Sequence, residues 1–237
     1  MLKHIEDKVD RFNKEGYIHL KNVIPNDLLS FTRLRAIKLK QDFDHKMGWP
    51  RHNGSGTFWG GLELASTLDP NLWKAYTSDL MYYIASKFLN TEPYLFNDQV
   101  VVKLPNEEFS FPEHFDNQYG PDPEGALNGD FQTINFMWAL TNVPKESGAL
   151  EIKNKETGNW DLVEAEAGDI IAIDGNTYHR SGHNQTDKIR AMYACVYSTK
   201  QMNFEGFHNR RWKFCSCKDG IINRKLPKEE NNLWEKV

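Results

Sequence analysis

Cysteine is scarce in this sequence, because only 3 of its 237 residues are cysteines. An odd and low number of thiols argues against a framework of disulfide bonds. Cys215 and Cys217 form a C-x-C pair, which raises the question of a zinc site. Structural zinc needs four ligands at suitable spacing, and His208 is the one further candidate nearby, so we expect two ordinary thiols.

Long apolar runs and an excess of positive charge are missing as well. No stretch approaches the roughly 20 apolar residues that a membrane-spanning helix needs. The first residues, MLKHIEDKVDRF, include acidic side chains and lack the apolar region of a signal peptide, so we expect a cytoplasmic protein. The net charge of −4 argues against a partner that is nucleic acid or anionic lipid.

The composition is that of one globular domain. Hydrophobic residues make up 39% of the chain and aromatic residues 13%, enough for a substantial core. Repeats, low-complexity tracts and linkers that would divide two domains are not apparent. We therefore expect a single domain over residues 1–237, with a helical part at about 1–90, a β core at about 91–200 and a C-terminal extension at 201–237.

The first ninety residues show helical patterns. Ile5, Val9 and Phe12 lie at helical spacing, and Gly16 ends that segment. The patterns that follow predict a short strand at 16–20, a helix from about residue 25 and a helix over 71–88. Between them, glycines surround Phe58 in a segment that reads either as a loop over a binding site or as a plain surface connection.

After residue 90 the pattern becomes that of β-strands. Strands are predicted at 100–102, 133–138, 170–173 and 191–197, with turn residues between them. Helices followed by short strands favour an α+β fold in which helices buttress a sandwich, barrel or jelly roll.

Two histidines and an aspartate carry the most informative chemistry. His114 and Asp116 are separated by one residue, and on a strand such a pair points to one side. His179 follows just after the strand predicted at 170–173. Two imidazoles and one carboxylate make the facial triad of non-haem iron(II) oxygenases, which leaves positions open for a co-substrate and O2. Taken singly, His114 could be a surface residue, His179 could cap a turn, and His183 could compete as a ligand.

Arg190 opens the last predicted strand. An arginine inside a barrel needs an anionic partner, and its planar fork matches a carboxylate. One interpretation is an anchor for the distal carboxylate of 2-oxoglutarate. The other is an ion pair with Asp169, Asp174 or Asp187.

Several segments together resemble the phytanoyl-CoA dioxygenase family. The segment HRSGHN at 179–184, followed by Arg190, looks like that family's H-x-S-G-x-N…R signature, and HFD at 114–116 looks like its H-x-D. Further likenesses are FNKEGY, NVI, WALTNV, SGAL and EAGD, at residues 12–17, 22–24, 138–143, 147–150 and 166–169. The similarity runs from about residue 10 to about residue 200, and it is specific in combination rather than in any one piece.

The resemblance implies a mainly β core, a double-stranded β-helix of jelly-roll or cupin type, buttressed by N-terminal helices. It implies that His114, Asp116 and His179 bind iron(II). Arg190 and the hydroxyl of Ser181 would then hold the distal carboxylate of 2-oxoglutarate.

The strands that usually line the co-substrate pocket in this family supply three more candidates. These are Gln99, Lys103 and Trp138. Phe115 departs from the family pattern, in which Gln is common at this position, so contacts near the iron are expected to differ.

The resemblance also implies an oxygenase that consumes 2-oxoglutarate and O2, releases succinate and CO2, and hydroxylates or otherwise oxidises a C–H bond. Related halogenases have a small residue where this chain has Asp116, so oxidation is favoured. The negative net charge disfavours an acyl-CoA and favours a small metabolite or natural-product intermediate. Candidate substrate contacts are Phe58, Trp59, Asn117, Gln118 and Tyr119.

Two other classes of protein remain open. A cupin-like hydrolase or isomerase could use the same ligands with another metal, but it would need neither Arg190 nor O2. A silent β-barrel that binds a small ligand would tolerate replacement of His114 or His179. The sequence leaves the oligomeric state open.

Overall fold

The computed structural model describes residues 5–46, 61–63 and 65–201. The helices are α1 (Ile5–Glu15), α2 (Asn26–Lys46), α3 (Ala65–Leu68), η1 (Pro70–Leu72), α4 (Trp73–Tyr76), α5 (Asp79–Leu89), η2 (Asp116–Tyr119), α6 (Pro123–Asn128) and η3 (Lys145–Ser147). The strands are β1 (Tyr17–Leu20), β2 (Gly61–Glu63), β3 (Tyr94–Lys103), β4 (Phe111–His114), β5 (Thr133–Ala139), β6 (Leu150–Lys153), β7 (Trp160–Val163), β8 (Ile170–Asp174), β9 (His179–Ser181) and β10 (Arg190–Ser198).

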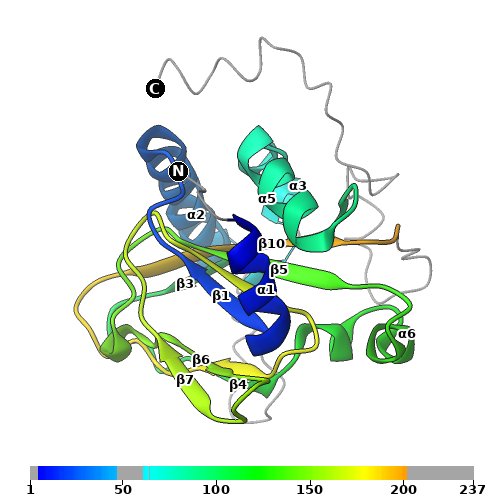
Figure 1. Ribbon diagram of the computed structural model, residues 1–237. Helices are drawn as coiled ribbons and strands as arrows, with labels where there is room; N and C mark the ends of the chain where they lie inside the picture. The colour runs from blue at the N-terminus through cyan, green and yellow to red at the C-terminus, as the bar shows by residue number, and fades with distance from the viewer. Residues whose placement is uncertain (1–4, 47–60, 64, 202–237) are drawn as a thin grey trace.

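The described strands form two antiparallel sheets. The large sheet has the order β1-β8-β5-β10-β3-β2, and the small sheet has the order β4-β9-β6-β7. In Figure 1, α2 and α5 lie on one side of the large sheet, and β4, β6 and β7 lie on its other side. Strands that alternate between two facing sheets in this way make a double-stranded β-helix, as the family resemblance implied.

The large sheet is buried on both faces, which explains its apolar strands. Along β5, Phe136 and Trp138 pack into the core beneath the helices, whereas Met137 and Ala139 pack into the core between the sheets. Side chains of a strand alternate between faces, so each β5 residue belongs to one core or the other. The core between the sheets is the interior in which the candidate site lies.

Aromatic rings tie the helices to the large sheet. Phe88 of α5 meets Phe12 of α1 edge-on at 5.2 Å between ring centroids and Phe136 of β5 at 5.9 Å. Phe136 in turn contacts Tyr197 of β10 at 5.8 Å. Such pairs add about 0.5–1.5 kcal/mol each beyond their buried area, so they fix the helical layer against the strands.

Most predicted elements are present, with one clear error among the helices. Instead of one helix over 71–88, the chain forms η1, α4 and α5, with a break at Thr77 and Ser78. Ser78 is extended, with φ −62° and ψ 151°, and its hydroxyl accepts from the Met81 amide as the N-cap of α5. A capping serine therefore ends one helical segment and begins the next.

Some predictions lie outside the described residues. Phe58, Trp59, Cys215 and Cys217 all fall there, and so does most of the extension at 201–237. The assignment of the whole chain to one domain therefore stays a prediction. Within the described ranges, every helix is too short or too polar to cross a lipid bilayer.

Candidate metal centre

Backbone pairing brings the two histidines together. His114 ends β4 and lies directly opposite His179 of β9 in the small sheet. The Nδ1 of His114 lies 2.7 Å from the Pro112 carbonyl oxygen, and that of His179 lies 3.0 Å from the Thr177 carbonyl oxygen. A carbonyl only accepts hydrogen bonds, so each Nδ1 is the protonated nitrogen and each Nε2 keeps a free lone pair. Both rings are thus held as metal ligands commonly are.

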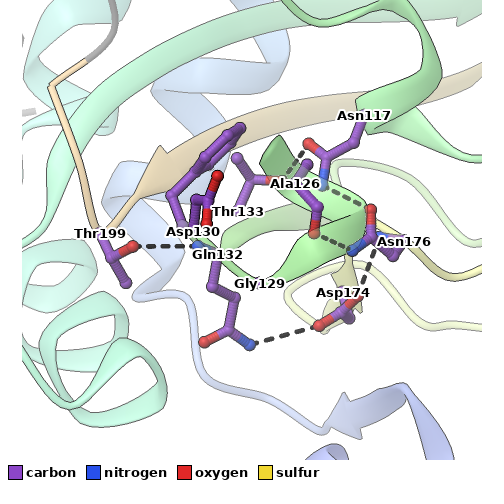
Figure 2. A pocket seen from close by; sticks show the side chains of 10 residues that line it. Asn117, Ala126, Gly129, Asp130, Gln132, Thr133, Asp174, Asn176 and Thr199 are labelled. Carbon is purple, nitrogen blue, oxygen red and sulfur yellow. Dashed lines mark hydrogen bonds between the residues drawn. The ribbon is translucent and has the colours of Figure 1, made fainter. Parts of the chain in front are cut away.

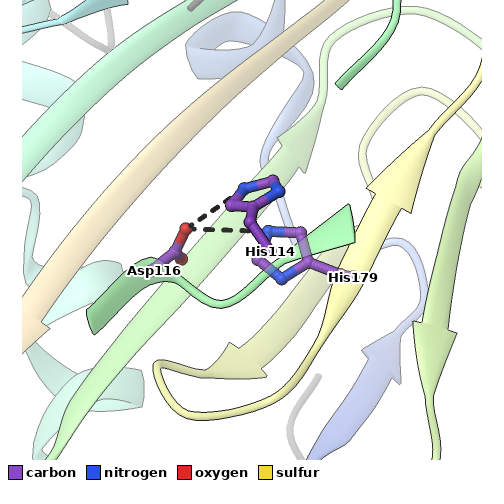
Figure 3. Close-up of side chains that lie close together, drawn as sticks. All are labelled: His114, Asp116 and His179. Carbon is purple, nitrogen blue, oxygen red and sulfur yellow. Dashed lines mark ion pairs between the residues drawn. The ribbon is translucent and has the colours of Figure 1, made fainter. Parts of the chain in front are cut away.

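Asp116 reaches the same point from a different element. The strand ends at His114, and Asp116 opens the short helix η2. The expectation from the sequence that strand alternation explains their proximity is wrong, because Asp116 is not on the strand. Asp116 Oδ1 lies 3.8 Å from His114 Nε2 and 3.6 Å from His179 Nε2. Figure 3 shows the three side chains pointing toward one another.

The geometry and electrostatics of this cluster fit a divalent metal ion. Each of the three residues offers one ligand atom, and these atoms lie within 4.8 Å of one another. Ligand atoms that each lie about 2.1 Å from one ion are separated by at most about 4.2 Å, so the separations to Asp116 are compatible. Burial, and then the charge of His179, lowers the pKa of His114, which favours the neutral imidazole that binds metal.

A neighbouring amide fixes the orientation of the aspartate. Asn135 of β5 donates from Nδ2 to Asp116 Oδ2 at 2.9 Å. Asp116 Oδ1 is thereby left to face the two imidazoles. Sequence reasoning missed Asn135, although it is a polar residue within an alternating strand, which is the signal that could have identified it.

Arg190 opens β10 and, two residues before Met192, faces the same interior between the sheets. It is 1% exposed, and its Nε, Nη1 and Nη2 atoms have no hydrogen-bond partner among the residues that the structure describes. Burial lowers its pKa to about 10. A buried, unpaired guanidinium is costly, so this group is suited to an anionic ligand.

The acidic residues that could have neutralised Arg190 are engaged elsewhere or exposed. Asp169 lies 2.7 Å from His19 Nε2, and Asp174 pairs with Lys155 at 2.9 Å. Asp187 is exposed. An intramolecular ion pair thus does not account for Arg190 within the described ranges.

Lys103 adds a second basic group beside Arg190. It is the cross-strand neighbour of Arg190, and its Nζ donates to Ser181 Oγ at 2.9 Å and to the Gly182 carbonyl. Burial, and then the charge of Arg190, lowers the pKa of Lys103 to about 6. A buried guanidinium and a buried amine that can take up a proton, beside one hydroxyl, form an environment for a carboxylate.

A glycine helps to position Ser181. Gly148 has φ +77°, and a Cβ atom there would collide with the backbone of Gly182. Only glycine combines that conformation with so close an approach. The turn SGAL therefore packs behind the hydroxyl that faces Lys103.

The other predicted pocket residues separate into two groups. Gln99 lies opposite Ala194, whose side chain faces the interior, so Gln99 faces it too. Trp138 does not, because its ring packs beneath the helices and its Nε1 donates to Met81 Sδ at 3.2 Å. The prediction that Trp138 lines the pocket is wrong, since it faces the opposite side of β5.

The three residues after Asp116 that were predicted to contact the substrate lie in different surroundings. Asn117 bonds to Thr133 Oγ1 at 2.6 Å and to Asn176 at 2.8 Å, and it lines a cavity of about 360 Å³ beside α6, shown in Figure 2. Gln118 is half-buried, and Tyr119 is exposed with its ring 6.2 Å from that of His114. Of these three, Tyr119 is the one whose ring contacts the metal centre.

Comparisons with known proteins agree with this arrangement. The phytanoyl-CoA dioxygenase (PhyH) family model matches residues 151–192, which include His179, Ser181 and Arg190. "Dioxygenase af480" of Aspergillus fumigatus is 39% identical over 88 residues, 31% of this chain and 28% of that protein. The chain therefore aligns with under a third of that relative's length.

Two solved structures share the fold. The epimerase SnoN, in complex with Fe3+, alpha ketoglutarate and nogalamycin RO, has a TM-score of 0.67 and 19% identity, covering 84% of this chain and 86% of SnoN. EctD from S. alaskensis, with 2-oxoglutarate and 5-hydroxyectoine, has a TM-score of 0.65 and 17% identity, covering 81% of this chain and 74% of EctD. The chain is thus similar to the phytanoyl-CoA dioxygenase (PhyH) family over residues 151–192, and it shares the double-stranded β-helix fold of SnoN and EctD.

Proposed function

We propose that this chain is an iron(II)- and 2-oxoglutarate-dependent dioxygenase. Its reaction is the hydroxylation, or another oxidation, of an unactivated C–H bond in a small metabolite or natural-product intermediate, with release of succinate and CO2. The observation that carries this proposal is the buried guanidinium of Arg190, which has no hydrogen-bond partner among the described residues, in an interior that also holds His114, Asp116 and His179.

The three ligands would bind one face of the iron ion. That arrangement leaves coordination positions for a chelating co-substrate and for O2. Bound iron(II) would supply O2 activation coupled to oxidative decarboxylation of 2-oxoglutarate. The chain's own task at this end is to hold each imidazole with its Nε2 toward the metal and to orient the carboxylate, and the contacts of His114, His179 and Asp116 serve that task.

Arg190 and Ser181 would hold the distal carboxylate of 2-oxoglutarate. Ser181 Oγ accepts from Lys103, so its own hydrogen remains available to donate to an anion. His179 and Ser181 are two residues apart on β9, which separates them by roughly 6.6 Å. A five-carbon dicarboxylate could therefore reach from the metal to Ser181 and Arg190.

The wall between the two ends is apolar. Met137, Ile171, Met192 and Ala194 all belong to the core between the sheets. Water is poorly accommodated there, so the charge of Arg190 acts in a medium of low dielectric. Exclusion of water also protects the reacting centre from side reactions.

The substrate class rests on charge and on the ligand set. The net charge of −4 is unfavourable for the phosphates of an acyl-CoA. Asp116 occupies the position that halogenases leave small, so oxidation rather than halogenation is proposed. The SnoN and EctD structures contain nogalamycin RO and 5-hydroxyectoine, respectively, and a small-molecule substrate for this chain is proposed by analogy.

A spectroscopic titration tests this function. Anaerobic addition of iron(II) and 2-oxoglutarate to the apo-protein should produce a weak visible charge-transfer band that requires both additions. The band should be lost in Arg190→Ala and His179→Ala and kept in Arg180→Ala, because Arg180 is partly exposed and pairs with Glu151. An absent band, together with no calorimetric binding of 2-oxoglutarate, would leave the hydrolase and binding-protein alternatives ahead.

A further inference from the structure

The side-chain amide of Asn135 has a hydrogen bond at Nδ2, and its Oδ1 has none within the described residues. Its Nδ2 donates to the Asp116 carboxylate, which can only accept, so the assignment of nitrogen and oxygen in this amide is set by chemistry. Its Oδ1 is buried and has no hydrogen-bond partner among the described residues. The residue as a whole is 6% exposed, so this acceptor lies inside the protein beside the candidate metal centre.

Asn97 presents a second acceptor in the same row of the large sheet. Val196 of β10 pairs with Asn97 of β3 on one side and with Asn135 of β5 on the other. Residues that pair across strands point to the same face, so all three side chains face the barrel interior. Asn97 Oδ1 is also buried and lacks a partner in the part of the chain that the structure describes.

The two acceptors flank an apolar floor. Adjacent strands lie about 4.8 Å apart, so the backbones of Asn97 and Asn135 are roughly 10 Å apart, with Val196 between them. A buried acceptor that lacks a donor is costly, and two in one row need a common explanation. The polar groups of the cavity beside α6 differ, since Asn117 and its neighbours satisfy one another.

The row of Asn97, Val196 and Asn135 offers hydrogen-bond acceptors, whereas the end of β3 at Lys103 offers hydrogen-bond donors. The Arg190 guanidinium and the Lys103 amine can donate hydrogen bonds there, whereas Asn97 and Asn135 offer carbonyl oxygens that have no partner among the described residues. The carboxylate of Asp116 adds negative character on the same side. A ligand group that donates hydrogen bonds suits this end.

We propose that Asn97 and Asn135 form a subsite that accepts hydrogen bonds from a hydroxyl or a protonated amine of the substrate, next to the carbon that is oxidised. This inference rests on the proposed function, because it assumes that a substrate enters beside the metal. It narrows the substrate to molecules that carry such a donor close to the reacting C–H bond.

A matched panel of small molecules tests the subsite. The probes are small cyclic alcohols and primary amines, each paired with its methyl ether or its trimethylammonium counterpart, which removes the donor and keeps the shape or the charge. Binding to the anaerobic iron(II)–2-oxoglutarate complex is followed by calorimetry and by the shift of its visible band. Alcohols or amines should bind at least about tenfold more tightly than their blocked partners, and the preferred arm identifies the group.

Substitutions of Asn97 test whether the preference for donor probes comes from this pair of asparagines. Asn97→Leu keeps the approximate shape but removes the acceptor, and it should reduce the preference to within about twofold. Asn97→Ala, which also removes the acceptor, serves as the second variant if the leucine protein does not fold. Three outcomes would overturn the subsite. They are equal binding of the donor probes and their blocked partners, a preference that survives both variants, and no binding by any probe. If the wild-type protein did not bind 2-oxoglutarate, the proposed function itself would be overturned.

The hydrogen bond from Asn135 to Asp116 carries a second inference independently of the free acceptors. We infer that Asn135 is a positioning residue that presents Asp116 Oδ1 to the metal. Asn135→Leu should weaken binding of manganese(II) or cobalt(II) alone by about 10- to 100-fold and alter the visible spectrum of the cobalt(II) form. Asn97→Leu is the matched control, and its metal affinity should stay at the wild-type value. Equal metal affinity in both variants would contradict the role of Asn135.

Discussion

The cavity beside α6 and the barrel interior both contain buried polar groups, but these groups are arranged differently. In the cavity, Asn117 bonds to Thr133 and Asn176, and Asn176 bonds to the Ala126 carbonyl. In the interior, the guanidinium of Arg190 and the Oδ1 atoms of two asparagines are buried without partners among the described residues.

The difference shows how unsatisfied groups indicate ligands. Each unpaired buried polar group costs about 1–3 kcal/mol, and more when it is charged. A region that satisfies its own polar groups gains little from a ligand, whereas a region that does not can recover that cost on binding. The interior, with a donor end at Arg190 and an acceptor end at Asn135, is therefore the better candidate site.

Removing the unpartnered cation should have the largest effect. Arg190→Met deletes two charge-assisted hydrogen bonds to 2-oxoglutarate at roughly 1.5–3 kcal/mol each, so affinity should fall by about 10²- to 10⁴-fold. Calorimetry with the manganese(II) form measures this. Arg180→Met is the matched control, because that arginine is partly exposed and its loss should leave affinity nearly unchanged. A wild-type affinity in Arg190→Met would remove Arg190 from the co-substrate site.

Removing a metal ligand should be nearly as severe. Asp116→Ala should lower manganese(II) affinity by more than the roughly 100-fold typical of residues that only support ligands, and it should abolish oxidation. Metal titration followed by competition with a chelator gives the affinity. Full activity in this variant would show that Asp116 is not a ligand. His183→Ala, which changes an exposed histidine, should leave metal binding as it is.

A smaller effect is expected from pH, through Lys103. Its pKa of about 6 lies below the ordinary 10.5, so a bound carboxylate that favours the charged amine should raise it. Binding of 2-oxoglutarate then takes up a proton, and affinity should fall by up to about tenfold per pH unit from pH 6 upward. Calorimetry in two buffers of different ionisation enthalpy counts the protons. Lys103→Met should abolish this dependence.

The same lysine affects stability with a definite sign. Because the folded pKa is the lower one, the unfolded chain binds more protons between pH 6 and pH 10.5. Lys103 therefore makes the ligand-free protein more stable as pH rises through that window. Urea denaturation across the window should show a flatter profile in Lys103→Met. An unchanged profile would mean that Lys103 is not buried as the structure shows.

The smallest effect on ligand binding is expected in the satisfied region. Asn117→Ala should destabilise the fold by about 1–3 kcal/mol, because Thr133 and Asn176 lose a partner. Its affinity for 2-oxoglutarate should stay within about threefold of the wild type, a change of less than about 0.7 kcal/mol. Denaturation and calorimetry on one preparation separate the two effects. If Asn117→Ala instead kept wild-type stability and lost turnover, Asn117 would be a substrate contact.

The sequence predicted the residues that belong to a motif. It missed those whose role depends on which face of a strand points into the interior. His114, Asp116, His179 and Arg190 follow from spacing and resemblance, and the structure brings the first three together. Trp138 was placed in the pocket wrongly because β5 is apolar on both faces, so its alternation shows a period of two without showing which face is the interior.

Long-range partners were also beyond the sequence. The bond from Asn135 to Asp116 joins β5 to η2, and nothing local in either segment specifies the other. The pairing of Asn97, Val196 and Asn135 depends on the register of three strands from distant parts of the chain. Helix boundaries failed for a local reason, since the cap at Ser78 competes with an otherwise continuous helical pattern.

The stability of Arg190→Met with and without 2-oxoglutarate tests the central claim most directly. If the unpaired guanidinium is retained for a ligand, the manganese(II)-loaded variant should be more stable than wild type by about 1–4 kcal/mol in the absence of 2-oxoglutarate. The wild type should gain about 2.7 kcal/mol at 100 times the dissociation constant, and the variant should gain almost nothing at that concentration. A variant that is less stable than wild type and still gains from 2-oxoglutarate would contradict this account.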